Sequence, residues 1–165
     1  IVNLGANILT VGAKEEGSAA KKPFLLQGGA KGEKPAAESL PPFQVGIQKP
    51  FGKRNETVAV AKVSNASVVS SGNYERYFVA DGRLYHHILD TRTGYPVESG
   101  LCGVTIFSES STVGDALSTA CFCLGAKEAS ALIEKTEGVE ALFITADGEL
   151  LTTSGLDIDA LSYLR

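Results

Sequence analysis

The order of apolar patterns along the chain most constrains its fold. Apolar and polar residues alternate with period two at residues 43–47 and 58–63, which is typical of strands with one buried face. Segments long enough for helices come later, at residues 113–124 and 126–135, and Gly125 between them is a natural helix stop. Because strands come first and helices cluster afterwards, the sequence predicts an α+β fold, with a mainly antiparallel β-sheet and helices packed on it.

Short turn signals separate the strand-like segments. Asp81-Gly82 is a strong hairpin signal and places Phe78 and Tyr85 on adjacent antiparallel strands. Gly72-Asn73 offers similar turn chemistry between residues 67–71 and 74–79. The same reasoning predicts further elements: two strands within residues 1–11, a strand at 103–107, a hairpin of 141–144 with 149–152, a first-helix cap at Ser111 or Thr112, and a short helical segment at 157–164.

Chain length and composition limit the domain organisation and the classes of partner. At 165 residues the chain has the size of one domain, so we expect residues 1–165 to form a single domain. Residues 12–42 are dominated by Lys, Glu, Gly, Ala, Ser and Pro, which predicts a mobile surface insertion there. A net charge of −4 without a basic stripe argues against nucleic-acid binding. The three cysteines show no disulfide or metal spacing and are interpreted as buried free thiols.

An Asp-x-x-Ser-Thr pattern near the start of the first expected helix is a candidate metal site. Asp115 and Thr119 are four residues apart and would lie on one helix face, one turn from each other. Their oxygens could meet a single cation, with Ser118 adding its carbonyl or hydroxyl. Mg²⁺ typically takes one or two carboxylates together with waters and ligand phosphates, which this partial set suits. The alternative is structural: an aspartate favoured by the helix N-terminus, and a threonine without a special role.

Both histidines of the chain lie together before the loop at residues 90–94. His87 could act as a base toward a hydroxyl group or donate to a phosphate, whereas His86 would face the opposite side of the strand. Arg92 is a candidate phosphate contact in the same loop. The alternative left open for His87 is a structural histidine that a neighbouring carboxylate satisfies.

Five short motifs follow one another along the chain. They are Gly5-Ala6-Asn7, Val45-Gly46-Ile47 followed by Pro50, Ser71-Gly72-Asn73-Tyr74-Glu75-Arg76, the segment from His87 to Gly94, and Asp115-Ala116-Leu117-Ser118-Thr119-Ala120. Taken in this order, they resemble the pattern of the ApbE family, the FAD:protein FMN transferases. The resemblance covers nearly the whole chain apart from residues 12–42.

The resemblance implies a fold, a reaction and a set of site residues. The fold would be ApbE-like and related to the T-fold. The reaction would be Mg²⁺-dependent transfer of FMN from FAD to a Thr or Ser hydroxyl of a target protein, with release of AMP. The roles implied by the resemblance are metal ligation by Asp115 and Thr119 with Ser118 close by, contacts to the flavin nucleotide at Ile88, Gly72 and Asn7, and proton acceptance by His87.

The chain also departs from the family pattern. Thr91 stands where the family usually has Pro, and Ala6 stands where it has Gly; neither change removes a reactive group. The family's upstream Asp-x-Gly-x-x-Ala-Lys-Gly segment has no counterpart, so the chain is expected to be the C-terminal portion of such a protein. An alternative is therefore a flavin-nucleotide-binding module or an inactive fragment. A second chain or copy would then complete the fold, and the family's usual location implies the bacterial periplasm or membrane, reached through an upstream anchor.

Overall fold

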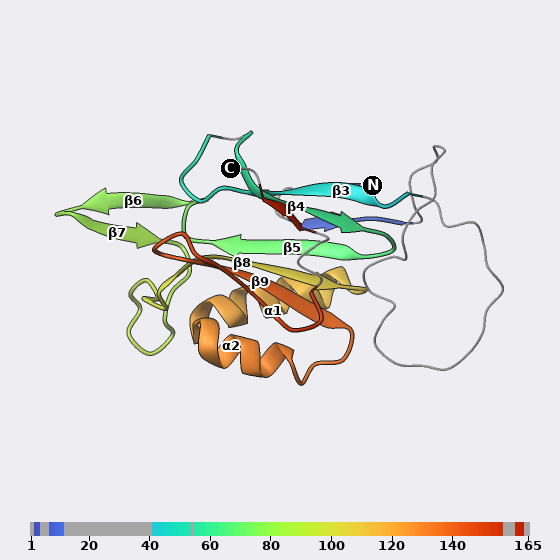
Figure 1. Cartoon of the computed structure of the whole chain (residues 1–165). Coiled ribbons are helices and arrows are strands. Elements are labelled where there is room, and N and C mark those ends of the chain that lie inside the picture. The colour runs from blue at the N-terminus through green and yellow to red at the C-terminus, as the bar shows by residue number, and fades with distance from the viewer. Residues whose placement is uncertain (1, 4–6, 12–40, 54, 157–160, 164–165) are drawn as a thin grey trace.

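The structure is a computed structural model that describes residues 2–3, 7–11, 41–53, 55–156 and 161–163 (Figure 1). Most of the expected insertion, residues 12–40, lies outside the described residues. The elements in chain order are β1 (Val2–Asn3), β2 (Asn7–Leu9), β3 (Phe43–Gln48), β4 (Thr57–Val63), β5 (Ser67–Gly72), β6 (Tyr77–Ala80), β7 (Arg83–His86), β8 (Leu101–Ser108), α1 (Ser111–Leu124), α2 (Ala126–Ile133), β9 (Val139–Thr145), β10 (Leu150–Thr152) and β11 (Leu161–Tyr163).

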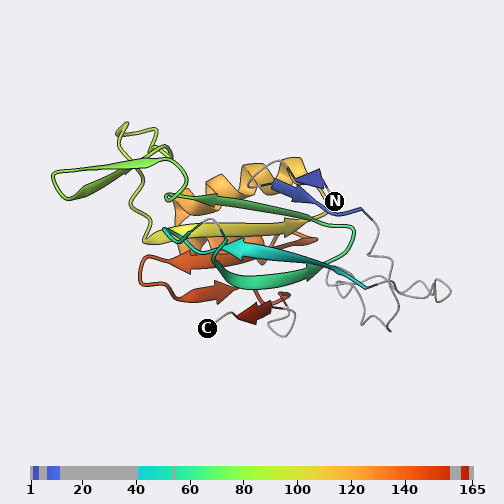
Figure 2. The same ribbon diagram turned by 90° about the horizontal axis from the view of Figure 1, so that it is seen from above.

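The described strands form a central sheet that is covered on both faces. Its strand order is β1-β2-β5-β8-β9-β10, and every neighbouring pair is antiparallel. A smaller sheet, β11-β4-β3, lies over one face, and the two helices lie under the other (Figures 1 and 2). This confirms the predicted α+β fold with a mainly antiparallel sheet. Residues 43–47 and 58–63 were expected as strands, and they form this separate covering sheet together with β11.

Two apolar clusters fill the spaces on either side of the central sheet. One joins the small sheet to the central sheet and includes Val45, Ala61 and Phe107. The other joins the central sheet to the helices and includes Val104 and Phe122. Because β8 contributes to both clusters, all eight of its residues are buried. The central sheet is therefore packed on both faces, and α1 packs against one of them.

Helix α1 begins at Ser111, two residues before the predicted start at residue 113. Ser110 has an extended backbone, and its hydroxyl accepts the N–H of Val113 at 3.4 Å, so Ser110 is the cap. The predicted cap at Ser111 or Thr112 is wrong because both residues are already helical. The predicted stop at Gly125 is confirmed, since its N–H donates to the Cys121 carbonyl at the end of α1.

The turn predictions have mixed outcomes. The Asp81-Gly82 hairpin is confirmed, with Phe78 opposite Tyr85 and their rings stacked 5.1 Å apart. The turn expected at Gly72-Asn73 is present at Asn73 and Tyr74, directly after β5, but the strands before and after it do not pair with each other, because β5 pairs with β2 and β8 whereas β6 pairs with β7. The two segments belong to different sheets, and the Asn73 N–H donates to the Cys102 carbonyl at 3.1 Å.

The terminal segment was expected to be helical, and this is wrong for Leu161–Tyr163, which forms β11. That strand pairs antiparallel with β4, and Leu161 lies opposite Ala61. Pairing with an existing strand supplies the backbone hydrogen bonds that a three-residue segment could not make alone. The remainder of the predicted segment, residues 157–160 and 164, lies outside the described residues.

Candidate functional site

A cluster of three hydroxyl groups joins strand β5 to helix α1. The Ser71 Oγ lies 2.8 Å from the Ser118 Oγ and 3.2 Å from the Thr119 Oγ1. The Ser118 hydroxyl also donates to the carbonyl of Asp115, one turn earlier in α1, at 3.0 Å. The cluster therefore connects all three residues of the predicted metal site to the sheet, through a strand residue that sequence reasoning did not select.

The close approach of α1 to β5 explains how these groups meet. Gly114 faces β5, and a Cβ atom added there would lie 2.9 Å from the Val69 side chain. Val69 and Ser71 are two apart on β5 and therefore share the face that α1 covers. A glycine at this position lets the helix pack against the strand, which brings Ser118 within hydrogen-bond distance of Ser71.

Asp115 and Thr119 are both exposed, whereas Ser118 is fully buried. An exposed carboxylate and an exposed hydroxyl one turn apart fit the predicted pair of ligands for a hard cation such as Mg²⁺. No group of three or more His, Cys, Asp or Glu side chains that could hold a metal occurs in the part of the chain that the structure describes. The residues present therefore fit a cation that keeps waters and ligand phosphates among its ligands.

The structure argues against direct ligation by the Ser118 side chain. Its hydroxyl is buried, and its hydrogen is donated to the Asp115 carbonyl. A hydroxyl has one hydrogen and two lone pairs, and here the Ser71 hydroxyl already occupies one side of the oxygen. We therefore assign Ser118 to holding α1 in place beside β5.

Asn7, a predicted nucleotide contact, lies on β2 and accepts a hydrogen bond from the Ser111 hydroxyl at 2.8 Å. Ser111 is the first residue of α1. Asn7 therefore fixes the N-terminal end of the helix that carries Asp115. A direct contact between Asn7 and a nucleotide stays a prediction.

Gly72, also a predicted nucleotide contact, has a structural reason to be glycine. An added Cβ atom would lie 2.8 Å from the Cys102 carbonyl oxygen and 2.3 Å from the ring of Tyr74. Distances this short require the neighbouring atoms to move, and the carbonyl belongs to the backbone of β8. The absence of a side chain at Gly72 therefore preserves the pairing of β5 with β8, immediately beside Ser71.

We predict that Gly72→Ala destabilises the fold by about 1–3 kcal/mol, because the added methyl group has no space. The matched control is Gly103→Ala on the opposite strand, where an added Cβ would make ordinary contacts of 3.4 Å or more. Urea unfolding of the two variants measures the difference. Equal midpoints for Gly72→Ala and the unchanged protein would contradict the packing argument.

The two adjacent histidines have different surroundings. His86 is buried: its Nδ1 accepts the N–H of Ile88 at 3.3 Å, so its Nε2 carries the hydrogen and donates to the Val97 carbonyl at 3.2 Å. Burial lowers the pKa of His86, which favours its neutral form. His87 is exposed, and its Nδ1 lies 3.4 Å from the Arg76 carbonyl. His86 is therefore the structurally satisfied histidine, and His87 is the one open to a substrate.

No hydrogen bond among the described residues joins His87 to Asp115 or Thr119, so its role as a base stays a prediction. Ile88, the next residue, is 6% exposed and belongs to the apolar cluster beneath the central sheet. The backbone N–H of Ile88 donates to His86, and its carbonyl accepts from Val97. A contact between Ile88 and a flavin nucleotide likewise stays a prediction.

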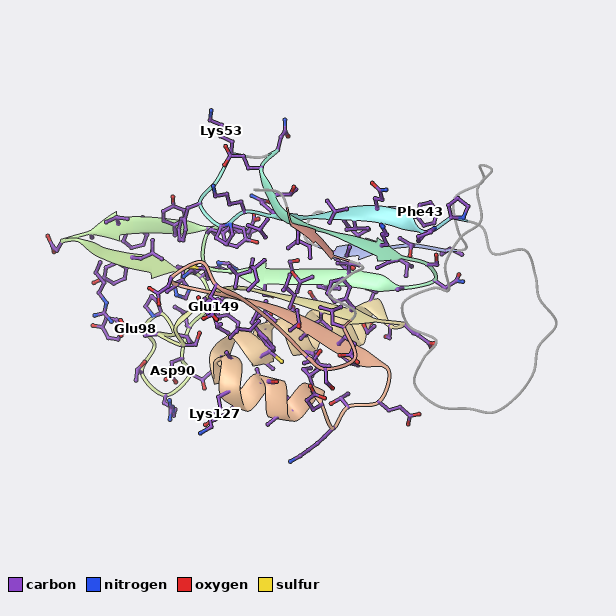
Figure 3. All side chains as sticks on the ribbon, in the orientation of Figure 1. Phe43, Lys53, Asp90, Glu98, Lys127 and Glu149 are labelled. Carbon is purple, nitrogen blue, oxygen red and sulfur yellow. The ribbon has the colours of Figure 1, made fainter. Side chains whose placement is uncertain are left out.

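Arg92 is hydrogen-bonded to Asp90, and both residues lie in the loop at residues 90–94. Its guanidinium donates to both carboxylate oxygens of Asp90, at 3.1 and 2.8 Å, and these hydrogen bonds lower the pKa of Asp90 to about 2. Asp90 and Glu98 lie on the loops below the β6–β7 hairpin (Figure 3). An open hollow of about 390 Å³ lies here, lined by Arg83, Asp90, Thr93, Tyr95, Pro96, Val97 and Glu98. Arg92 is therefore already paired, which weakens its case as a phosphate contact.

Comparison with solved structures places this layered architecture among the ApbE proteins. The crystal structure of the ApbE protein of Thermotoga maritima superposes with a TM-score of 0.62 at 36% identity, over 70% of this chain and 37% of that one. The apo form of the flavinyl transferase ApbE of Pseudomonas stutzeri matches with a TM-score of 0.55 at 32% identity, over 69% of this chain and 35% of that one.

Sequence comparison agrees with the structural one. The model of the ApbE family matches residues 1–143. The FAD:protein FMN transferase of Treponema pallidum is 39% identical over 156 residues, which are 94% of this chain and 39% of that protein. The corresponding protein of Klebsiella pneumoniae is 37% identical over 70% of this chain and 37% of its own length. The chain belongs to the ApbE family, and it spans less than two fifths of the length of these relatives.

Among the residues that the structure describes, no helix is both long enough and apolar enough to cross a membrane.

Proposed function

We propose that this protein is an FAD:protein FMN transferase and that this chain carries the cation ligands and the proton acceptor of its active site. The reaction would transfer FMN from FAD to a threonine or serine hydroxyl of a target protein and release AMP. The observation that carries the proposal is the exposed Asp115 and Thr119 pair, anchored to β5 through Ser71 inside a region that matches the ApbE family.

The proposed transfer replaces one phosphorus–oxygen bond with another. The acceptor hydroxyl oxygen forms a bond to the FMN phosphorus, and the bond from that phosphorus to the AMP oxygen breaks. AMP leaves with that oxygen, and the acceptor hydroxyl gives up its proton. His87 is the proposed acceptor of the proton: when its Nδ1 carries hydrogen toward the Arg76 carbonyl, its Nε2 is free to take one.

Asp115 and Thr119 would hold the divalent cation that the family resemblance implies. Such a cation, when bound, neutralises charge on the pyrophosphate of the substrate. The Asp115 carboxylate would supply the negative charge, and the Thr119 hydroxyl a neutral oxygen ligand. Both groups are exposed, so a nucleotide and its waters have access to them.

The direct test is a flavinylation assay. The protein is incubated with FAD, Mg²⁺ and a panel of peptide fusions that each carry one threonine or serine. We expect at least one fusion to acquire flavin fluorescence that survives denaturing electrophoresis, together with an equal amount of AMP by chromatography. Absence of both products at every fusion would contradict the proposal.

A second candidate function is binding of a flavin nucleotide without transfer. It is favoured by the small set of ligands proposed here, in which Asp115 supplies one carboxylate, whereas Mg²⁺ is usually bound by one or two. FAD titration followed by flavin fluorescence, with AMP measured in the same samples, separates the two functions. Binding without AMP in the presence of Mg²⁺ favours the binding module, and AMP release excludes it.

A further inference from the structure

Ser71 is the strand residue at the centre of the hydroxyl cluster, and its position makes a specific role testable. It lies on β5, one residue before Gly72, and is partly buried beneath α1. Its hydroxyl contacts two consecutive helix residues, Ser118 and Thr119, across 47 and 48 positions of sequence. Among the described residues, Ser71 is the strand residue whose hydroxyl lies within hydrogen-bond distance of Ser118 and Thr119.

A count of hydrogens sets the direction of the hydrogen bonds. The single hydroxyl hydrogen of Ser118 is donated to the Asp115 carbonyl. The 2.8 Å contact between Ser118 and Ser71 must then use the hydrogen of Ser71, with Ser118 accepting. Once the Ser71 hydrogen is used, the 3.2 Å contact with Thr119 must use the hydrogen of Thr119, with Ser71 accepting.

This direction matters for what Thr119 can offer. Its only hydroxyl hydrogen points at Ser71, so both lone pairs of its Oγ1 are left for an external group. Without Ser71, the hydroxyl could instead donate to the carbonyl four residues earlier in the helix, because threonine in a helix divides between two rotamers for this reason. That carbonyl belongs to Asp115.

We infer that Ser71 is a positioning residue, which accepts the Thr119 hydroxyl hydrogen and thereby leaves the Thr119 oxygen as a pure acceptor for a divalent cation beside Asp115. The inference deepens the proposed function and rests on it for the identity of the bound group. The direction of the hydrogen-bond chain itself rests on the geometry of β5 and α1 alone.

Ser70 provides a closely matched control. It is the preceding residue of β5 and points to the opposite face of the sheet. There it makes an equivalent hydroxyl contact of 2.9 Å with Thr105 on β8. Ser70→Ala and Ser71→Ala therefore remove the same hydroxyl group from neighbouring positions. Each substitution also removes at least one contact with another hydroxyl group. Only Ser71→Ala removes a contact to Thr119.

The first measurement follows the Thr119 side chain by NMR, without any metal. Three-bond couplings to the Thr119 methyl carbon should report one rotamer in the unchanged protein, in Ser70→Ala and in Ser71→Thr, which keeps the hydroxyl. Ser71→Ala should show averaging between two rotamers. A single, unchanged rotamer in Ser71→Ala would overturn the inference.

The second measurement is an Mn²⁺ titration followed by electron paramagnetic resonance. Ser71→Ala should weaken Mn²⁺ binding by about three- to tenfold, the range expected from one hydrogen bond, while Ser70→Ala leaves it unchanged. In a Thr119→Val background, Ser71→Ala should have no further effect, because the oxygen that it positions is gone. Equal Mn²⁺ affinity in Ser71→Ala and the unchanged protein would overturn the inference.

The two proposals fail in different ways. Weaker Mn²⁺ binding in Ser71→Ala, with no flavin transfer by the unchanged protein, would support Ser71 and count against the transferase. Normal transfer with unchanged Mn²⁺ affinity in Ser71→Ala would overturn the role of Ser71 alone. An unchanged protein that binds no Mn²⁺ would overturn both.

Discussion

Asp115→Asn is expected to lower Mg²⁺-dependent flavin transfer by about 100-fold or more, because it removes the negatively charged ligand that the described residues supply to the proposed cation site. Asparagine keeps the size of the side chain and one carbonyl oxygen but loses the negative charge. Asp115 is exposed, so the substitution disturbs no buried contact. The rate of AMP release at saturating FAD, measured across a range of Mg²⁺ concentrations, gives the effect.

Glu128→Gln is the matched control for this charge change. Glu128 is an exposed carboxylate in the first turn of α2, the neighbouring helix. It has no place in the hydroxyl cluster, so its loss should leave the Mg²⁺ activation curve unchanged. An Asp115→Asn protein with the same curve as the unchanged protein would remove Asp115 from the site, and with it the observation on which the transferase proposal depends.

The order of motifs along the chain was sufficient to identify the family, but the site required the fold. Asp115 and Thr119 could be paired from their spacing alone, since residues four apart on a helix share a face. Ser71 could not be assigned to the site from its spacing, although it lies inside one of the five motifs that resemble the family pattern. Its role depends on which face of β5 meets α1, and that is set by a pairing with β8 more than 30 residues away.

Burial explains the other differences between expectation and structure. Ser118 precedes Thr119 in the pattern and was expected to contribute its carbonyl or hydroxyl to the metal, yet its side chain is fully buried, which leaves only the carbonyl as a predicted ligand. His86 and His87 were expected to face different surroundings, and His86 is buried whereas His87, one residue beyond the end of β7, is exposed. The second sheet was not anticipated, because period-two alternation shows that β3 and β4 each have a buried face without showing what covers it.

Phe122→Ala is expected to cost about 3–5 kcal/mol of unfolding free energy, the usual loss for a phenylalanine deleted from a well-packed core. Phe122 is 0% exposed and lies in the apolar cluster between α1 and the central sheet. Its ring meets the His86 ring edge-on, with 5.8 Å between the centroids. It comes three residues after Thr119, so the same packing that buries it holds the proposed cation ligands against β5.

The control is Phe78→Ala, which removes the same side chain from the β6–β7 hairpin, where Phe78 is 62% exposed. Its loss should cost no more than about 1.5 kcal/mol, the contribution of its stacking on Tyr85. Urea unfolding, with the slope checked for constancy, measures both variants. Should Phe122→Ala be no more destabilising than Phe78→Ala, α1 would not be docked on the sheet, and neither Ser71 nor the Asp115 and Thr119 pair could form the site described.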